Sequence, residues 1–230
     1  MIKSFLILIS LQIFLIASEQ IILVVSDNFK SPKAFLECYE GKKQVFNTIE
    51  VNIGKNGMGW GLGKLNLKHD NSQPIKIEGD KKAPAGVFNL TDIYGYKKSN
   101  SYNLPYLHAT KELICVDDVD SKYYNRIIKT TSLPKSFEYM KRDDNQYELG
   151  IVVSHNKEAV KGRGSCIFMH VQKSEDAPTA GCTAMTLENL KKIALWLEKE
   201  KKPILIQIPK SSADEIKRLY PNLKNSKLLN

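Results

Sequence analysis

One cysteine of this chain stands on a bare glycine turn. Residues 177–185 are APTAGCTAM, so Cys182 directly follows Gly181 within a run of small side chains. Structural cysteines normally pack among bulky apolar neighbours, which this stretch lacks. Four roles are open for Cys182: half of a disulfide, a metal ligand, a small buried hydrophobe, or a nucleophile.

A histidine lies where it can serve a nucleophilic thiol. His170 ends the apolar run SCIFMH and precedes Cys182 in the chain. A neighbouring imidazole can take the thiol proton, and the thiolate is the reactive form. Cys182 is therefore a candidate nucleophile and His170 a candidate general base, with a structural histidine as the alternative for His170. The amides of Gly181 and Cys182 would bind the oxyanion, and Thr179 and Thr183, which flank the thiol, would bind substrate.

The other three cysteines do not suggest a metal site. Cys38, Cys115 and Cys166 are far from any CxxC spacing, and no CxxC…HxxxH pattern exists. No metal or other cofactor is expected. Cys115 and Cys166 each lie in an apolar, strand-like run and are our candidates for a disulfide. The alternative is that both are buried free thiols.

Further polar residues are candidates for the cleft around the thiol. His155 and Asn156 follow the apolar run LGIVVS, and Asn156 is predicted to bind substrate or the backbone near the thiol. Alternatively, His155 and Asn156 only mark the end of a strand and have no role in the cleft. Asp117, Asp118 and Asn125 form either a carboxylate or metal site or, as the segment DDVDSKYYN favours, a turn with Asx-type hydrogen bonds.

The fold class follows from short apolar runs. They are rich in β-branched residues, and Gly, Pro, Asn, Asp or Lys clusters bound each one. These runs span residues 21–26, 34–40, 44–51, 85–93, 112–118, 149–155, 165–171 and 203–209. This pattern predicts a mainly β domain. The glycine-rich segment 56–64 is predicted to be a loop, because it lacks the GK[ST] ending of a phosphate loop.

One amphipathic helix is predicted after the cysteine turn. In residues 186–202, leucines and an alanine recur on one helical face. Thr186 is the expected N-cap, and Pro203 is expected to stop the helix. Packing on the β domain explains this apolar face without a partner. The tail from residue 212 is expected to add a short helix.

The order of several motifs resembles a known family. The segments EGDKKAPAGVFNL, CVDDVDSKYYN, YELGIVVSHN and GSCIFMHVQKSEDAPTAGCTAM follow one another within residues 50–210. Together they resemble the YkuD-type L,D-transpeptidase catalytic domain, in the branch with a Thr-Ala-Gly-Cys motif. The resemblance implies a β-sandwich-like fold. It also implies that the thiol attacks the bond between meso-diaminopimelate and the terminal D-alanine of peptidoglycan tetrapeptide stems, and passes the acyl group to an amine or water.

Two positions depart from the commonest form of that motif. Ala180 stands where many members have a second histidine, and Ala184 stands where many have an arginine thought to hold a substrate carboxylate. Arg163 and Lys161, on the glycine turn before His170, are candidate replacements for that arginine. The alternative is that both are solvated loop charges.

The first eighteen residues have the layout of a secretory signal peptide. One lysine precedes an apolar run from Phe5 to Ile16 and then small residues. We expect residues 1–18 to be a signal peptide and 19–230 a single catalytic domain without a stable membrane span after cleavage. The alternative is an uncleaved membrane anchor. Oligomeric state is not predicted.

Charge agrees with export to the cell envelope or periplasm. Removing the leader takes one lysine and no acid, so the net charge changes from +9 to +8. A basic exported protein suits an anionic surface such as cell wall. No basic run is interleaved with aromatics, which argues against a nucleic-acid partner.

The resulting hypothesis is an exported L,D-transpeptidase whose partners are peptidoglycan peptide stems. A close alternative is an L,D-carboxypeptidase that uses water as acceptor. Two more distant alternatives are a non-catalytic cell-wall-binding module with the same fold and an unrelated cysteine protease.

Overall fold

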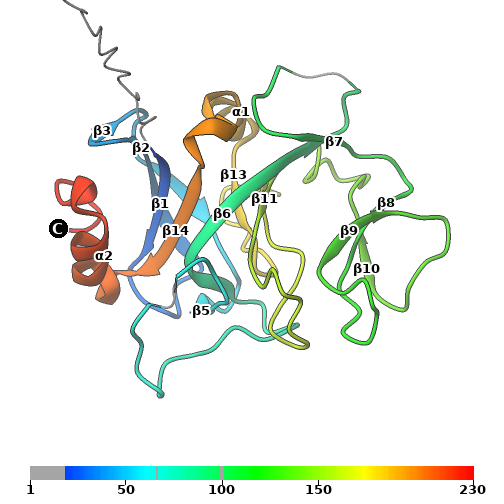
Figure 1. Ribbon diagram of the computed structural model, residues 1–230, viewed down its shortest axis with the longest axis horizontal. Helices are drawn as coiled ribbons and strands as arrows, with labels where there is room; N and C mark the ends of the chain where they lie inside the picture. Colours follow the sequence, from blue (N-terminus) through cyan, green and yellow to red (C-terminus); the bar gives the residue numbers. More distant parts are fainter. Residues whose placement is uncertain (1–18, 66, 99–100) are drawn as a thin grey trace, which may run out of the picture.

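A computed structural model describes residues 19–65, 67–98 and 101–230 of the chain (Figure 1). The predicted signal peptide, residues 1–18, lies outside the described residues. Strands dominate: β1 (Gln20–Ser26), β2 (Lys33–Glu40), β3 (Lys43–Gln44), β4 (Ile49–Asn52), β5 (Met58–Trp60), β6 (Ala83–Gly95), β7 (Tyr106–His108), β8 (Leu113–Val116), β9 (Arg126–Lys129), β10 (Phe137–Tyr139), β11 (Leu149–Val153), β12 (Phe168–Val171), β13 (Thr183–Met185) and β14 (Ile204–Pro209). Two α-helices, α1 (Leu187–Trp196) and α2 (Ala213–Leu219), follow near the C-terminus.

The large sheet closes on itself. Its strands run in the order β1-β14-β6-β11-β12-β13-β4-β2-β3, and β1 also pairs with β2, so the path returns to its start. The mainly β prediction is confirmed, and the large sheet is barrel-like rather than clearly the sandwich that the resemblance implied. Closure removes sheet edges that would otherwise be exposed. The length of a strand and its alternation of apolar and polar residues do not predict closure of the sheet. Closure depends on which strands pair with partners distant in the sequence.

The core of this sheet is built on β1 and β14, which pair in parallel. Every residue of both strands is buried, as expected of parallel strands covered on both faces. Polar side chains in this core have hydrogen-bond partners within the core. Gln207 donates to Pro84 O at 2.8 Å and accepts from Thr183 Oγ1 at 2.7 Å.

The predicted amphipathic helix is confirmed as α1. The Thr186 side chain caps it by accepting from the Asn189 amide at 3.3 Å, and Leu190, Ile193 and Ala194 are buried where α1 packs near β11 and β12. The helix ends at Trp196, earlier than predicted, since a separate 3₁₀ turn occupies residues 199–201. The short helix expected in the tail is α2. No helix in the described ranges is long and apolar enough to cross a membrane.

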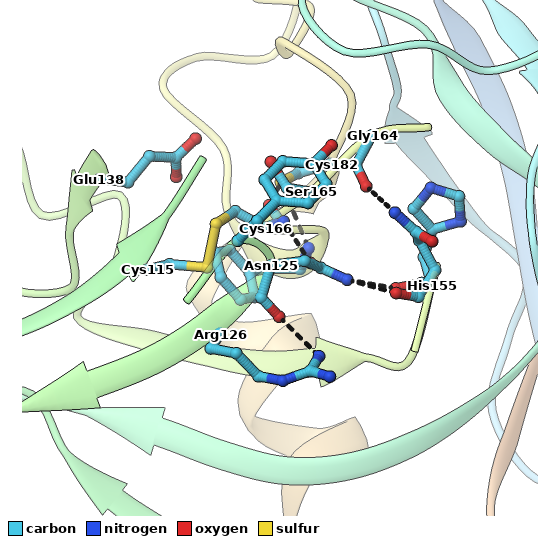
Figure 2. The surroundings of a disulfide bond; sticks show 12 residues. Cys115, Asn125, Arg126, Glu138, His155, Gly164, Ser165, Cys166 and Cys182 are labelled. Atoms are coloured by element: carbon cyan, nitrogen blue, oxygen red, sulfur yellow. Dashed lines mark hydrogen bonds between the residues drawn. A yellow bond between two sulfur atoms is a disulfide. The ribbon is translucent and has the colours of Figure 1, made fainter. Parts of the chain in front are cut away.

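A second, three-stranded sheet lies beside the barrel, in the order β10-β8-β9 (Figure 1). A disulfide between Cys115 of β8 and Cys166 connects it to the segment before β12 (Figure 2). The predicted pairing of Cys115 with Cys166 is therefore confirmed. The disulfide fixes one face of the small sheet against the barrel wall that carries His170.

Several boundaries differ from the sequence prediction. The run 44–51 divides into β3 and β4, the run 165–171 becomes a strand only at Phe168, and β5 lies inside the predicted glycine loop. Strands β7, β9, β10 and β13 had no matching prediction. All of these segments are three or four residues long, which is too short for an alternation pattern to develop.

Candidate active site

Strand pairing brings the predicted nucleophile and base to one wall of the barrel. β12 and β13 are parallel neighbours, with His170 opposite Ala184. Residues 172–182 therefore form a connection that returns the chain to place Cys182 at the start of β13. The sulfur accepts a hydrogen bond from the Phe168 amide of β12 at 3.3 Å.

Cys182 and His170 line the same cavity, which measures about 350 Å³. Thr179 and Gly181 of the cysteine turn also line it. A larger cavity of about 640 Å³ contains the other free cysteine, Cys38, but no histidine or carboxylate lines it. The smaller cavity is therefore the one that combines a thiol with acid–base groups.

In this conformation the thiol and the imidazole have separate hydrogen-bond partners. Cys182 Sγ donates to the Cys166 carbonyl at 3.6 Å, and His170 Nδ1 is 2.9 Å from the Val171 carbonyl. Among the described residues, no hydrogen bond joins Cys182 to His170. A neutral ring that donates from Nδ1 keeps Nε2 as an acceptor, so the His170 tautomer suits a base.

Burial keeps both groups uncharged. It raises the pKa of the Cys182 thiol to about 12, with a further contribution from the negative charge of Glu138. Burial lowers the pKa of His170 to about 4, aided by the positive charge of Arg142. The resting pair at neutral pH is therefore a thiol and a neutral imidazole, and not a thiolate–imidazolium pair.

The turn before Cys182 has a specific backbone requirement. Gly181 has φ +147°, and a Cβ there would lie 2.9 Å from the Lys82 carbonyl oxygen. Thr179 Oγ1 accepts from the Gly181 amide at 3.0 Å and donates to the Cys182 carbonyl at 2.7 Å. Because its N–H is engaged, Gly181 can serve as an oxyanion donor only after it exchanges this partner. Thr179 therefore shapes the turn as well as lining the cavity.

The sequence was compared with known families, curated proteins and solved structures. It matches the sequence model of the YkuD family, described as the L,D-transpeptidase catalytic domain, over residues 20–206. The chain belongs to this family. No curated protein and no solved structure gave a significant match. The matched region begins upstream of the motifs at residues 50–210 and includes the core strand β1.

Other predicted site residues of this L,D-transpeptidase domain lie outside the cavity. Asn156 donates to the carbonyls of Val160 and Gly164 at 3.0 and 2.9 Å, so it holds its own loop. Thr183 is buried and bonds Gln207 on β14. In this conformation both side chains have partners inside the fold, and their contact with substrate stays a prediction.

The proposed arginine replacements are also placed elsewhere. Arg163 Nε donates to the Lys76 carbonyl at 3.3 Å, and Lys161 pairs with the exposed Asp120 at 3.3 Å. Neither lines the cavity. His155 is buried against the Arg163 carbonyl at 2.9 Å and also lies outside it.

The aspartate-rich segment is divided between two roles. Asn125 donates to the carbonyls of His155 and Asn156 at 2.9 and 2.8 Å and accepts from the Cys166 amide at 3.0 Å (Figure 2). It therefore connects the small sheet to the barrel. Asp118 accepts from the Asp120 amide, an Asx-type turn bond as expected. Within the described ranges, no group of three His, Cys, Asp or Glu side chains could hold a metal ion.

Sequence reasoning missed several residues of the cavity wall, of which Tyr147 is the most central. Its hydroxyl donates to Glu138 Oε2 at 2.6 Å, and its ring meets the His170 ring edge-on with centroids 5.2 Å apart. Lys81 and Arg142 also line the cavity. Tyr147 and Lys81 lie in segments that resemble the family, YELGIVVSHN and EGDKKAPAGVFNL, but their side chains meet at the cavity only through tertiary packing.

Proposed function

We propose that this protein is an exported, cysteine-dependent L,D-transpeptidase that acts on peptidoglycan tetrapeptide stems. One observation carries the proposal: in a chain of this family, Cys182 and His170 line a single cavity beneath the small sheet. The Thr179-Ala180-Gly181-Cys182 turn presents the thiol, in keeping with the motif branch that it resembles.

The proposed first step is acylation of Cys182. Its sulfur attacks the carbonyl carbon between diaminopimelate and the terminal D-alanine, while the thiol proton passes to His170 Nε2. Collapse of the tetrahedral intermediate breaks the C–N bond, and the imidazolium returns the proton to the leaving amine of D-alanine. The products are a thioester on Cys182 and free D-alanine.

The second step releases the enzyme. An acceptor amine attacks the thioester carbonyl, loses a proton to His170, and expels the Cys182 thiolate, which is then reprotonated. Water in place of the amine gives hydrolysis to a tripeptide. Both outcomes share the first step and are separated by product analysis.

The neutral resting pair supports base catalysis at the moment of attack. A thiol with a pKa near 12 is almost fully protonated at neutral pH, so it needs a base as the new bond forms. The thiol must turn from the Cys166 carbonyl toward His170 to react. Charge that develops on the substrate oxygen would be received by the Cys182 amide, and by the Gly181 amide once it leaves Thr179.

Lys81 is our candidate for the substrate carboxylate, in place of Arg163 and Lys161. It lines the cavity, and no ion pair engages its side chain within the described part of the chain. The other two cationic side chains of the wall are already paired: Lys76 with Asp80 at 2.6 Å and Arg142 with Asp144 at 2.5 Å. Lys81 would then bind the substrate carboxylate, in place of the arginine that many members have where this chain has Ala184.

We place the protein in the periplasm or cell envelope. The apolar run from Phe5 to Ile16 supports secretion. The Cys115–Cys166 disulfide supports an oxidising compartment. Peptidoglycan lies in this compartment and is the proposed substrate of the family activity, so we propose it as the partner.

The test is incubation with purified disaccharide-tetrapeptide, followed by mass spectrometry. Wild type should release D-alanine and form dimers linked through two diaminopimelate residues, and Cys182→Ala should do neither. Cys38→Ala is the matched control, since it removes the other free buried thiol outside the cavity. Tripeptides without dimers would indicate a carboxypeptidase. Unchanged substrate with wild type would favour the binding module.

A further inference from the structure

One face of the small sheet presents carboxylates to the cavity. Glu138 of β10 stands opposite Cys115 of β8 in the antiparallel register, so both point to the same face. Asp117 follows Cys115 by two residues and continues that face. The disulfide from Cys115 to Cys166 fixes this face beside the thiol (Figure 2). Asp117, Glu138 and Cys182 all line the cavity.

Asp117 has an unusual environment. Its Oδ1 is buried and has no hydrogen-bond partner among the described residues. A buried carboxylate oxygen without a partner is unfavourable, and a ligand donor in the cavity would relieve it. No described side chain or backbone group supplies this donor, so it would come from water or a ligand in the cavity, which the partly exposed Asp117 lines.

The acidic groups of the wall have only neutral partners. Glu138 accepts from the Tyr147 hydroxyl at 2.6 Å, and Glu78 accepts from the hydroxyls of Tyr124 and Ser165 at 2.5 and 2.6 Å. Burial raises the pKa of Glu138, and the Asp117 charge raises it further. Lys76 and Arg142 are paired with acids of their own. Lys81 is the remaining cationic side chain of the described wall, against the three carboxylates of Glu78, Asp117 and Glu138, so the wall keeps an excess of negative charge.

We propose that Asp117, with Glu138 beside it, forms a subsite that binds a primary ammonium group of the stem peptide. This inference rests on the proposed function, because it takes the ligand to be a peptide with a free side-chain amine. The ammonium belongs either to the diaminopimelate of the acyl donor or to that of the acceptor. Its N–H groups hydrogen bond to Asp117 Oδ1, and its charge balances the carboxylates.

The test uses Asp117→Asn, which removes the charge and keeps the side-chain shape. Glu138→Gln is the second variant. Asp120→Asn is the matched control, since it makes the same change at an exposed position outside the cavity. Because Asp117 Oδ1 has no hydrogen bond to lose, the Asp117→Asn protein should unfold at a temperature no lower than wild type.

Binding is measured first, in a Cys182→Ala background that cannot react. The probes are the disaccharide-tetrapeptide with a free side-chain amine and the same compound with that amine acetylated. Asp117 should favour the free amine by about tenfold, and Asp117→Asn should bind both probes equally. This preference holds even if wild type proves catalytically inactive, so the subsite and the proposed function fail separately.

Turnover then identifies the source of the ammonium. D-alanine release is followed as the single-turnover burst, which precedes attack by the acceptor amine. If the ammonium belongs to the donor, acetylation slows this burst about tenfold in wild type and not in Asp117→Asn. If it belongs to the acceptor, Asp117→Asn forms about tenfold fewer dimers with the free-amine substrate while the burst is unchanged. Equal behaviour of Asp117→Asn and Asp120→Asn in binding and in both turnover assays would overturn the proposal.

Discussion

The reactive pair combines two residues whose charged forms are both disfavoured. Cys182 and His170 are 7% and 5% exposed, and desolvation opposes both the thiolate and the imidazolium. The Phe168 amide at the sulfur is the compensating group, and its effect lowers the thiol pKa. In the proposed mechanism, proton transfer from Cys182 to His170 therefore begins only after substrate binds, and the resting pair is uncharged.

This arrangement predicts the pH dependence of acylation. Because the pKa of His170 is lowered to about 4, its basic form persists well below the usual histidine range. Single-turnover acylation should stay constant from neutral pH downward and fall to half near pH 4. The rate of D-alanine release over a pH series checks this. A rate that instead rises through pH 8 to 9, about the pKa of an ordinary thiol, would show that Cys182 reacts as a free thiolate without His170.

Gly181 is predicted to be intolerant of a side chain. Gly181→Ala places a Cβ 2.9 Å from the Lys82 carbonyl oxygen at φ +147°. We expect a loss of about 1–3 kcal/mol of unfolding free energy and a slower acylation, because the turn carries the thiol. Gly162→Ala is the control: φ is +73° there and nothing lies within 4 Å of the added carbon. Chemical denaturation that gives equal losses at both positions would contradict the contact with Lys82.

At the scale of elements, the small sheet depends on few connections to the barrel. The Cys115–Cys166 disulfide, the hydrogen bonds of Asn125, and the Tyr124 and Tyr147 hydroxyls bonded to Glu78 and Glu138 join the two parts. Cys166 has φ +53°, a conformation that costs a non-glycine residue about 1–3 kcal/mol. Its carbonyl is also the acceptor of the Cys182 thiol, so one residue, Cys166, connects the disulfide to the proposed nucleophile.

Removing the disulfide should loosen the small sheet selectively. The bond joins residues 51 positions apart, and its loss typically costs about 2–5 kcal/mol. In Cys115→Ser/Cys166→Ser, hydrogen exchange should accelerate in residues 113–139, while β1 and β14 stay protected. Cys38→Ala, which leaves the bond intact, is the control. Equal acceleration in β1 and β14 would mean that the disulfide stabilises the whole domain and not the small sheet.

The sequence predicted the elements that have their own signal. α1 followed from its apolar face and the Thr186 cap, and the buried strands β1 and β14 from their β-branched runs. Cys182 and His170, proposed from residue type and motif order, line one cavity, and their catalytic roles stay a prediction. Tyr147 and Lys81 were not assigned to the cavity, because they lie just before β11 and β6 and reach it only through tertiary packing. Asp117 was considered for a carboxylate or metal site or a turn, and its place in the cavity depends on which face of the small sheet meets the barrel. Closure of the large sheet was missed because it arises from the pairing of β1 with both β2 and β14.

At the scale of the whole molecule, stability depends on two histidines buried in neutral form. Burial lowers the pKa of both His155 and His170 to about 4, whereas an unfolded chain titrates near 6.5. Between these values the unfolded state binds more protons than the folded state, so unfolding free energy falls as pH decreases. Above pH 6.5 neither state is protonated at these sites, and the contribution is fully present.

Between pH 6.5 and 4, the free energy of unfolding should fall by up to about 3 kcal/mol for each of the two histidines. Urea denaturation at a series of pH values measures it. His155→Gln should remove about half of the dependence, and His155 lies outside the cavity, so the remaining half reports His170. A free energy of unfolding that is flat across this range would contradict the buried, neutral state of both rings.

The most direct test of the central claim is intact-protein mass spectrometry after rapid acid quench of enzyme mixed with disaccharide-tetrapeptide. We predict an adduct equal to the substrate without its D-alanine, on wild type and Cys38→Ala and not on Cys182→Ala, and peptide mapping should place it on Cys182. An adduct that persists in Cys182→Ala, or D-alanine release by that variant, would contradict the account.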